Sequence, residues 1–434
     1  MTPSRTPTRL LPKAYRPLFA HTRFRRLLPA MAVSDLGDGM SAVAVAWLAI
    51  LIAPPGRSGL LLGAAVAANS LPGAAGALLL GRRMRGIPAR RLLVANASLR
   101  AVCLGCIPLA WAAGLLNPVL YVVLLAASSM LSAWGSAGKY GLLAQLLVPE
   151  LRLAANALVG SSSSAAMVAG PALAGLLVAG VGPAWIIGLD ALSFAVLAVQ
   201  VGRLRLPPDA EPDASAASAS AASATTGMQL LRGQPQLLGI LAVTWVFYFL
   251  YGPVEVALPL HVSKDLHAGA GLLGMYWACY GVGAVLGGLT VGALRRLPLW
   301  PVTLGIVAGW GVVLVPVGLA VPTAVSLGCF ALGGLIYGPF IALSFTLFQQ
   351  RTPAALLTTV LAARSVALLT SDPVGTALGG PLTTALGAGR VLVGSGLATV
   401  ALAVGAAAVA TAVRARARAR SGGYVDPSSA DAAR

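Results

Sequence analysis

Long apolar runs that recur along the whole chain are the feature that most limits its possible folds. Twelve runs of about 20 residues follow one another, and an α-helix of that length crosses a hydrocarbon core about 30 Å thick. Charged residues make up only 10% of the 434 residues, whereas a soluble domain carries about 25%. The sequence therefore predicts an all-α, multi-spanning membrane protein. We place the spans near 28–52, 59–80, 92–114, 118–144, 154–181, 184–202, 237–261, 270–293, 301–320, 324–348, 355–383 and 390–412.

The predicted spans fall into two sets of six, separated by a segment rich in Pro, Ser and Ala that cannot form a packed core. Its last part, GMQLLRGQPQL, is typical of a short helix on the membrane surface. Gln145 and Pro149 after the fourth span have the same spacing as Gln349 and Pro353 after the tenth, which indicates an internal duplication. The expected parts are an N-terminal tail (1–27), a first bundle (28–202), a cytoplasmic linker (203–236), a second bundle (237–413) and a C-terminal tail (414–434).

Basic residues predict the orientation. With a cytoplasmic N-terminus, the outer loops hold only Arg57, Lys264 and Arg390, and both tails are basic. The positive-inside rule then places both termini in the cytoplasm. The formal charge of +18 follows from this topology and from attraction to anionic lipid headgroups, so we expect no nucleic-acid partner. The inner loops hold twelve arginines: Arg82, Arg83, Arg85, Arg90, Arg91, Arg152, Arg203, Arg205, Arg232, Arg295, Arg296 and Arg351.

Four stretches carry a resemblance to a known family. They are FRRLLPAMAVSDLGDGMSAVAVAWL, KYGLLAQLLVPELRLAANAL, VAGPALAGLLVAGVGPAWIIGLDALSF and GMYWACYGVGAVLGGLTVGAL. The chain resembles the major facilitator superfamily, in the branch of bacterial proton-coupled exporters that includes siderophore and macrolide efflux proteins. The resemblance implies two six-helix bundles, both termini in the cytoplasm, and export of small organic molecules across the bacterial cell membrane.

One motif of this resemblance favours export over import. Gly170, Pro171 and Gly175 in the fifth span match the pattern that the family associates with exporters. Pro171 removes a helix hydrogen bond, and the glycines permit close helix approach, so we expect a bend at a bundle interface. A packing role and a coupling role are both open for this motif.

The loop GRRMRGIPARR after the second span departs from the family pattern, because it keeps the basic residues and lacks the usual Asp. We expect Glu150 or the C-terminus of a helix to accept these arginines instead. The basic residues of this gating loop are Arg82, Arg83, Arg85, Arg90 and Arg91.

Two aspartates, Asp35 and Asp38, lie within the first span. Such acids are costly in a bilayer and face a cavity or a partner, and a spacing of three places both on one face of a helix. A carboxylate whose surroundings alternate between burial and a basic partner can carry a proton across. Both are therefore candidates for proton coupling, although each could instead pair statically with a base. Glu255, behind Gly252 and Pro253 in the seventh span, is the third candidate.

Few bases can serve as counter-charges inside the bundles. Arg100, Lys139 and Arg364 are the candidates. Asp372 follows Arg364 by eight residues and should lie on roughly the same helix face, so we expect Arg364 to pair with a carboxylate. Asp190 lies in a span that is peripheral in the family, and we interpret it as structural.

The resemblance implies that spans one, four, seven and ten line the substrate cavity. Aromatic residues on these spans suit an amphipathic organic compound, although aromatics also gather at membrane interfaces or serve as packing. The candidates are Trp47, Trp134, Tyr140, Trp245, Tyr248, Tyr251, Tyr337 and Phe340.

The sequence does not indicate a metal site or a nucleotide-binding site. Cys103 and Cys106 form a CxxC spacing without a second pair, so we expect packing residues and no metal site. No phosphate-binding G-x-x-x-x-G-K-[ST] motif is present, so we expect a proton gradient, without a cofactor, as the energy source and a functional monomer. The predicted function is export of amphipathic organic molecules in exchange for protons. An importer of the same fold and a non-transporting scaffold are the alternatives.

Overall fold

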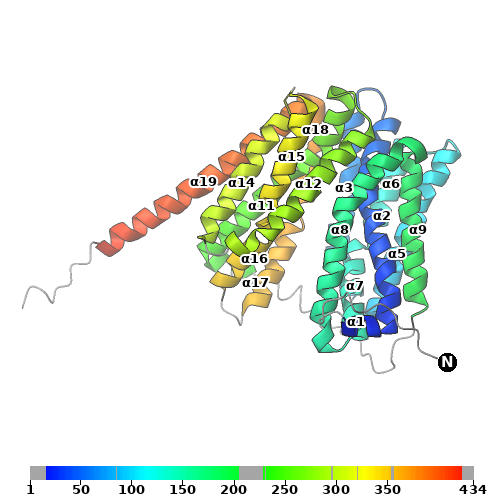
Figure 1. Ribbon diagram of the computed structural model, residues 1–434, viewed down its shortest axis with the longest axis horizontal. Coiled ribbons are helices and arrows are strands. Elements are labelled where there is room, and N and C mark those ends of the chain that lie inside the picture. The colour runs from blue at the N-terminus through cyan, green and yellow to red at the C-terminus, as the bar shows by residue number, and fades with distance from the viewer. Residues whose placement is uncertain are drawn as a thin grey trace, which may run out of the picture.

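The computed structural model describes residues 16–84, 86–204, 228–229, 231–294, 297–319, 321–352 and 356–422. These residues form helices joined by short turns, and no strand occurs among them (Figure 1). The first half contains α1 (Arg16–Ala20), α2 (Thr22–Ile52), α3 (Ser58–Leu79), α4 (Gly81–Met84), α5 (Ala89–Ala112), α6 (Pro118–Ser129), α7 (Ser132–Leu146), α8 (Pro149–Val181) and α9 (Pro183–Gly202). The second half contains α11 (Pro235–Leu260), the π-helical segment η2 (His261–Asp265), α12 (Ala270–Leu289), α13 (Val291–Leu294), α14 (Leu299–Val317), α15 (Thr323–Tyr337), α16 (Phe340–Arg351), α17 (Leu357–Leu368), α18 (Ser371–Leu386) and α19 (Ala388–Gly422).

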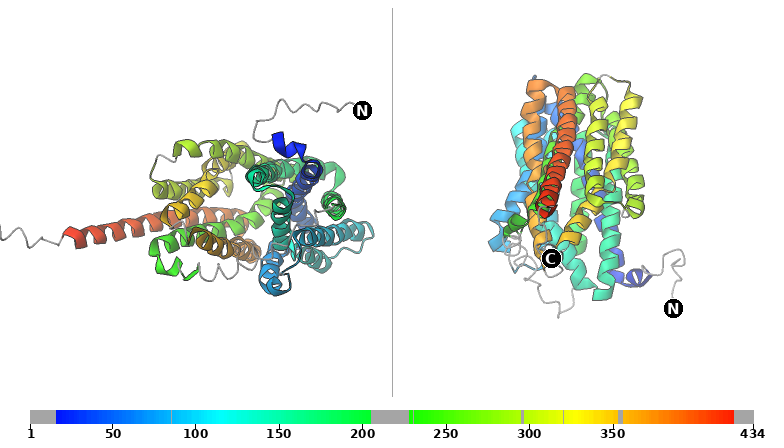
Figure 2. Two further views of the ribbon diagram at one scale, coloured as in Figure 1. Left: turned by 90° about the horizontal axis from the view of Figure 1, so that it is seen from below. Right: turned by 90° about the vertical axis from the view of Figure 1, so that its left-hand side faces the viewer.

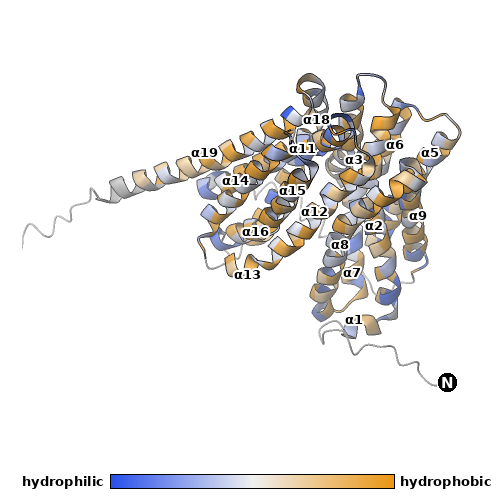
Figure 3. Cartoon of the chain, turned by 45° about the horizontal axis from the view of Figure 1, so that its top comes forward, coloured by the Kyte–Doolittle hydropathy of each residue, from blue (hydrophilic) through white to orange (hydrophobic). Residues whose placement is uncertain are grey.

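Eleven helical segments in the described part of the chain are long and apolar enough to cross a membrane. The fourth and tenth predicted spans are each two helices in line, α6 with α7 and α15 with α16. Pro339 interrupts the second of these pairs, since proline has no N–H to donate to the preceding turn. Hydrophobic residues run along the length of the helices (Figure 3). The predicted all-α membrane fold is confirmed.

The eleventh predicted span, 355–383, differs from expectation because α17 and α18 are separate helices. The chain turns at Leu369 and Thr370, and α18 then begins with Ser371, Asp372 and Pro373. Acidic residues and proline are favoured in the first turn of a helix, where N–H groups have no intrahelical acceptor. The break therefore follows from local sequence, although the summed length still spans a bilayer.

The two halves form separate bundles that meet at one end (Figures 1 and 2). Several close contacts at glycines join them, and two of these are between glycines of opposite halves. A Cβ on Gly63 of α3 would collide with the backbone of Gly380 in α18, and a Cβ on Gly175 of α8 would collide with Gly274 in α12. All four residues lie near the helix ends that are remote from α1, so the halves are closed together at that end.

The exporter-type motif lies at two of these helix contacts. Gly170 packs against the backbone of Gly39 in α2, within the first bundle, whereas Gly175 packs against the second bundle. Pro171 is buried between them, inside a helix that continues from Pro149 to Val181. The expected position at a bundle interface is therefore observed.

The boundaries of the tails and the linker differ in detail from the expected ones. Helix α2 begins at Thr22, so Arg23, Arg25 and Arg26, which precede the first predicted span, belong to that helix. Helix α19 continues to Gly422, through the start of the expected C-terminal tail, and projects beyond the second bundle (Figure 1). In the linker, residues 228–229 and 231–233 are helical, whereas its Pro- and Ser-rich part lies outside the described residues.

The contact between the halves predicts a specific cross-link. A Cβ on Gly59 would meet Thr383 Oγ1 of the other bundle, which is the proximity that a disulfide requires. In a chain without its four native cysteines, Gly59→Cys with Thr383→Cys should cross-link on oxidation. After proteolysis within the linker, the two halves should then migrate together on a non-reducing gel.

The pair Gly160→Cys with Thr383→Cys is the matched control, since a Cβ on Gly160 would meet nothing within 4 Å. If both pairs cross-link equally, or neither does, the closed end described here is wrong.

Candidate functional site

Asp38 of α2 forms an ion pair with Arg100 of α5 in the first bundle. Two bonds make the pair bidentate: Arg100 Nη1 donates to Asp38 Oδ2 at 2.9 Å, and Nη2 donates to Oδ1 at 2.5 Å. The guanidinium also lies over the ring of Phe194 of α9, 4.3 Å from its centroid. The Arg100 side chain is 11% exposed, whereas that of Asp38 is 42% exposed. The Asp38 carboxylate is thus accessible at the protein surface, whereas the Arg100 guanidinium is held inside the bundle.

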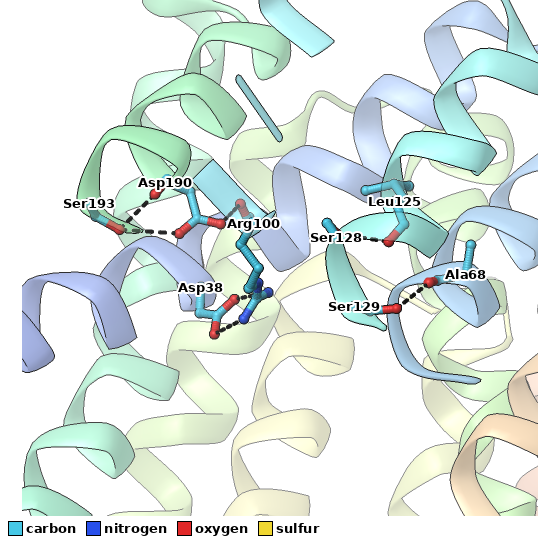
Figure 4. A network of polar contacts seen from close by, with 9 residues as sticks. Asp38, Ala68, Arg100, Leu125, Ser128, Ser129, Asp190 and Ser193 are labelled. Carbon is cyan, nitrogen blue, oxygen red and sulfur yellow. Dashed lines mark hydrogen bonds and ion pairs between the residues drawn. The ribbon is translucent and has the colours of Figure 1, made fainter. Parts of the chain in front are cut away.

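Asp190 of α9 is a second carboxylate beside the same arginine (Figure 4). It is fully buried and accepts a hydrogen bond of 2.7 Å from Ser41 Oγ. Gly37 makes room for it, because a Cβ there would collide with Asp190 Oδ1. We interpreted Asp190 from the sequence as structural and did not connect it with Arg100. No sequence signal links two residues ninety positions apart on different helices.

Asp35 forms a different pair, with Lys139 of α7. Lys139 Nζ donates to both carboxylate oxygens at 2.8 Å, and Ser163 Oγ of α8 also donates to Asp35. The lysine side chain is 15% exposed and the aspartate 21%. Asp35 and Asp38 therefore lie one turn apart on α2 and face different helices. Arg100 and Lys139 are both found beside these acids, whereas a role in proton coupling remains a prediction.

Glu255 of α11 lies beside two polar residues of α18, Asp372 and Thr376, in the second bundle. Glu255 is partly exposed, whereas Asp372 Oδ1 and Thr376 Oγ1 are buried and make no hydrogen bond. Among the residues that the structure describes, no Lys, Arg or His nitrogen lies within 4.0 Å of either carboxylate. The acids of this bundle thus lack the counter-charge found in the first bundle.

Arg364 of α17 does not form the expected ion pair. Its Nη2 donates to Ser344 Oγ at 2.8 Å, and its guanidinium lies 4.1 Å from the ring centroid of Phe345. No carboxylate of the described residues lies within 4.0 Å of it. The turn between α17 and α18 places Asp372 on a different helix from Arg364. The spacing of eight residues therefore does not place the two side chains on the same helix face.

The predicted cavity aromatics divide into two groups. In the second bundle, the hydroxyls of Tyr248 and Tyr337 are 3.3 Å apart, and Tyr337 stacks on the buried Phe340. Tyr251 packs against Trp310, and Trp245 Nε1 donates to Thr370 Oγ1. In the first bundle, Trp134 is buried and donates to Gly76 O at 3.1 Å, Tyr140 is 45% exposed and Trp47 is partly buried.

Helices α12 and α14 contribute aromatics that sequence analysis missed. Tyr280 lies 5.5 Å from Trp310 and 6.0 Å from Tyr337, measured between ring centroids. The resemblance assigned the cavity to the first, fourth, seventh and tenth spans, so no residue of these two helices was named as a candidate. The spacing of three between Trp277 and Tyr280, which places both on one helix face, was the available signal.

One basic residue of the gating loop is bound as expected at a helix C-terminus. Arg90 Nε donates to Val201 O at 3.1 Å, and its Nη2 donates to Gly202 O, at the end of α9. Carbonyls in the last turn of a helix carry partial negative charge, and Val201 O here accepts from Arg90 in addition to the Leu204 N–H at 3.2 Å. The contact joins α5 to α9 within one bundle, so it does not itself latch the halves. Arg83 and Arg91 are exposed, Arg85 is outside the described residues, and Arg82 lies at the start of α4.

No three His, Cys, Asp or Glu side chains of the described residues come close enough to hold a metal ion. Two helical bundles joined at one end, with apolar helices and partly buried charge pairs, define a multi-pass membrane transporter. The chain belongs to the major facilitator superfamily: the family model described as Major Facilitator Superfamily matches residues 27–371.

Known relatives and structures agree with this assignment. The chain is 26% identical over 378 residues to the multidrug efflux pump Tap of Mycobacterium tuberculosis, covering 83% of this chain and 87% of that protein. It is 29% identical over 286 residues to the enterobactin exporter EntS of Citrobacter koseri, covering 62% and 65%. A bacterial homologue of the iron transporter ferroportin, crystallised in an inward-facing state, superposes with a TM-score of 0.66 at 18% identity, over 88% of this chain and 98% of that one. At that identity the likeness shows the fold alone.

The two carboxylates beside Arg100 predict a measurable difference between the ion pairs of the first bundle. Arg100→Met would leave Asp38 and the fully buried Asp190 without a base, and should lower the free energy of unfolding by about 3 kcal/mol. Lys139→Met should lower the free energy of unfolding by a smaller amount, because it leaves only Asp35, which is partly exposed, without a base. Denaturant titration in mixed micelles would measure both.

The double variant Arg100→Met/Asp190→Asn should recover part of the loss, since it removes one of the two uncompensated charges. No recovery would mean that Asp190 does not interact with Arg100.

Proposed function

We propose that this protein is a secondary active transporter that exports small amphipathic organic molecules, such as a drug, an antibiotic or another secondary metabolite, in exchange for protons. It would work by alternating access, with the two bundles closing in turn at opposite ends. The transporter acts in the cell membrane as a multi-pass protein, with anionic headgroups around its basic cytoplasmic face.

The observation that carries the proposal is the pair of Asp38 and Arg100. Arg100 is held inside the first bundle by Phe194, while Asp38 stays partly exposed. A proton arriving on Asp38 removes the charge that holds the pair together, and its release restores the pair. Because the pair forms in one protonation state and opens in the other, each proton changes the relative stability of two conformations of the transporter.

The contact between the bundles supports alternating access. The halves meet through glycines at the end remote from α1, which is the outer end under the predicted topology. An exporter in this state receives its substrate from the cytoplasm. The efflux pump Tap and the exporter EntS, to which the chain is similar, favour the same direction.

The aromatic cluster of the second bundle supports an amphipathic organic substrate. Tyr248, Tyr251, Tyr280 and Tyr337 are partly exposed and combine large apolar rings with hydroxyl groups. Trp310 is buried behind Tyr251 and Tyr280. Sites for organic ligands combine such surfaces with a few polar groups that fix orientation. We further propose that the protein acts as a monomer, without a cofactor, and that the proton gradient supplies the energy.

A cell assay tests the proposal. An efflux-deficient bacterium that expresses the protein should accumulate less of some lipophilic dye or antibiotic than cells with an empty vector. A protonophore should abolish the difference. Asp38→Asn, at equal expression, should raise accumulation to the level of the empty vector, because the ion pair no longer responds to a proton.

Asp265→Asn is the matched control, since Asp265 lies at the end of η2 in the other bundle, is 45% exposed and pairs with His261 four residues earlier, so its loss should leave efflux unchanged. If cells that express Asp38→Asn show normal efflux, Asp38 has no role in proton coupling. Raised accumulation in cells with the wild-type protein would indicate import, and no change for any compound would favour the scaffold.

The pH gradient itself gives a second prediction. In everted membrane vesicles, an exporter moves substrate into the lumen as protons leave it. An acidic lumen should therefore drive substrate uptake, and nigericin, which dissipates the pH gradient, should stop it. Uptake that is driven instead by an alkaline lumen would contradict proton exchange.

A further inference from the structure

Arg364 of α17 is a buried arginine whose charge is not balanced by any acid of the described residues. The residue is only 5% exposed, and no carboxylate oxygen of the described residues lies within 4.0 Å of its guanidinium. Burial of an ionised group without an opposite charge is costly. An anion from outside the described part of the chain would therefore stabilise this arginine.

Arg100 of the first bundle shows how the same chain accommodates another buried guanidinium. Arg100 lies 4.3 Å from the ring centroid of Phe194, and it also forms the bidentate pair with Asp38. Arg364 has the corresponding aromatic contact, at 4.1 Å from the ring centroid of Phe345. The aromatic contact accompanies a carboxylate at Arg100, whereas at Arg364 it occurs without one among the described residues.

The guanidinium of Arg364 keeps donors that the described residues do not use. Nη2 donates to Ser344 Oγ at 2.8 Å. Nε is buried without an acceptor, as is Nε of Arg100. Nη1 forms no hydrogen bond with the described residues, and it is not sealed from the surface. Because guanidinium N–H groups form a planar fork that matches a carboxylate, an incoming acid group can bind here.

The hydroxyls of Tyr248 and Tyr337 lie on the same side of the bundle as this arginine. They are 3.3 Å apart, and both are near enough to interact with its charge. On α16, Phe340 packs against both tyrosine rings, and Ser344 accepts the hydrogen bond from Arg364. Residues four apart share a helix face. The two hydroxyls and the guanidinium are therefore arranged along one face of α16.

We propose that Arg364 and the hydroxyls of Tyr248 and Tyr337 bind the anionic group of an amphipathic organic acid, such as a carboxylate. Both tyrosines are partly exposed, so a ligand can reach them. The apolar part of the acid lies against the neighbouring rings, which include Tyr280 at 6.0 Å from Tyr337 between ring centroids. This inference rests on the proposed transport of amphipathic molecules and names their charge. It uses none of the carboxylates proposed for proton coupling.

Binding to the purified full chain in lipid nanodiscs tests the site. Equilibrium dialysis measures it, with empty nanodiscs as the blank. The probes are radiolabelled naphthylacetate and pyrenebutyrate, and each is compared with its uncharged primary amide. Loss of a hydrogen bond to a charged group weakens binding by about tenfold or more. We expect the wild-type protein to bind at least one acid about tenfold more tightly than its amide, and Arg364→Gln to bind the two alike.

Further variants separate the site from general effects of charge and folding. Tyr248→Phe and Tyr337→Phe keep the arginine and remove one hydroxyl each, so each should weaken binding of the acid more than binding of the amide. They test the site even if Arg364→Gln folds poorly. Arg351→Gln is the matched control, since Arg351 is an exposed arginine at the end of α16 that donates to Gln236. It removes the same net charge and should bind as the wild type does.

Three results would overturn the inference. They are no binding of either acid to the wild-type protein, equal affinity for acid and amide, and a preference for the acid that survives in Arg364→Gln. Dialysis needs no gradient, so the site can be confirmed where the proposed transport fails. Efflux of an uncharged compound from cells, together with equal affinity for acid and amide, would support transport and refute this site alone.

Discussion

Backbone hydrogen bonding that is completed within each helix is the constraint on which the rest of this structure depends. Lipid offers no partner to a free N–H or C=O group, so the spanning segments are helical. Because lipid tails are as apolar as the side chains, helices then associate through close packing of small residues. The contacts of Gly39 with Gly170 and of Gly63 with Gly380 are of this kind. The first joins helices within a bundle, and the second joins the bundles at one end.

Charge is distributed differently in the two bundles that this packing creates. The first bundle places Asp38 and Asp35 against bases from other helices, and it keeps a third acid, Asp190, fully buried beside Arg100. The second bundle separates Arg364 from its acids. Ionisable groups inside a membrane are costly and face the interior or a cavity. The two bundles therefore differ in whether their acids have a basic partner among the described residues.

Sequence analysis was most successful where the evidence was local. The apolar runs predicted eleven of the spans as observed and the eleventh, 355–383, as one helix where the structure has two, and the motif around Gly170 and Pro171 lies at the expected interface. It was wrong about Arg364, because a turn before Pro373 separates that arginine from Asp372. It also missed Tyr280 and Trp310, since they lie on α12 and α14 and the resemblance assigned the cavity to other spans.

The sequence by itself determined the fold class, since apolar length and the cost of unpaired backbone groups leave helices as the solution. It also determined which residues bear charge inside the membrane. Only the tertiary structure decided their partners. Asp35 and Asp38 are one turn apart, yet they bind Lys139 and Arg100 on different helices. The rotation and crossing of each helix settle such pairings, and these depend on contacts between residues far apart in the chain.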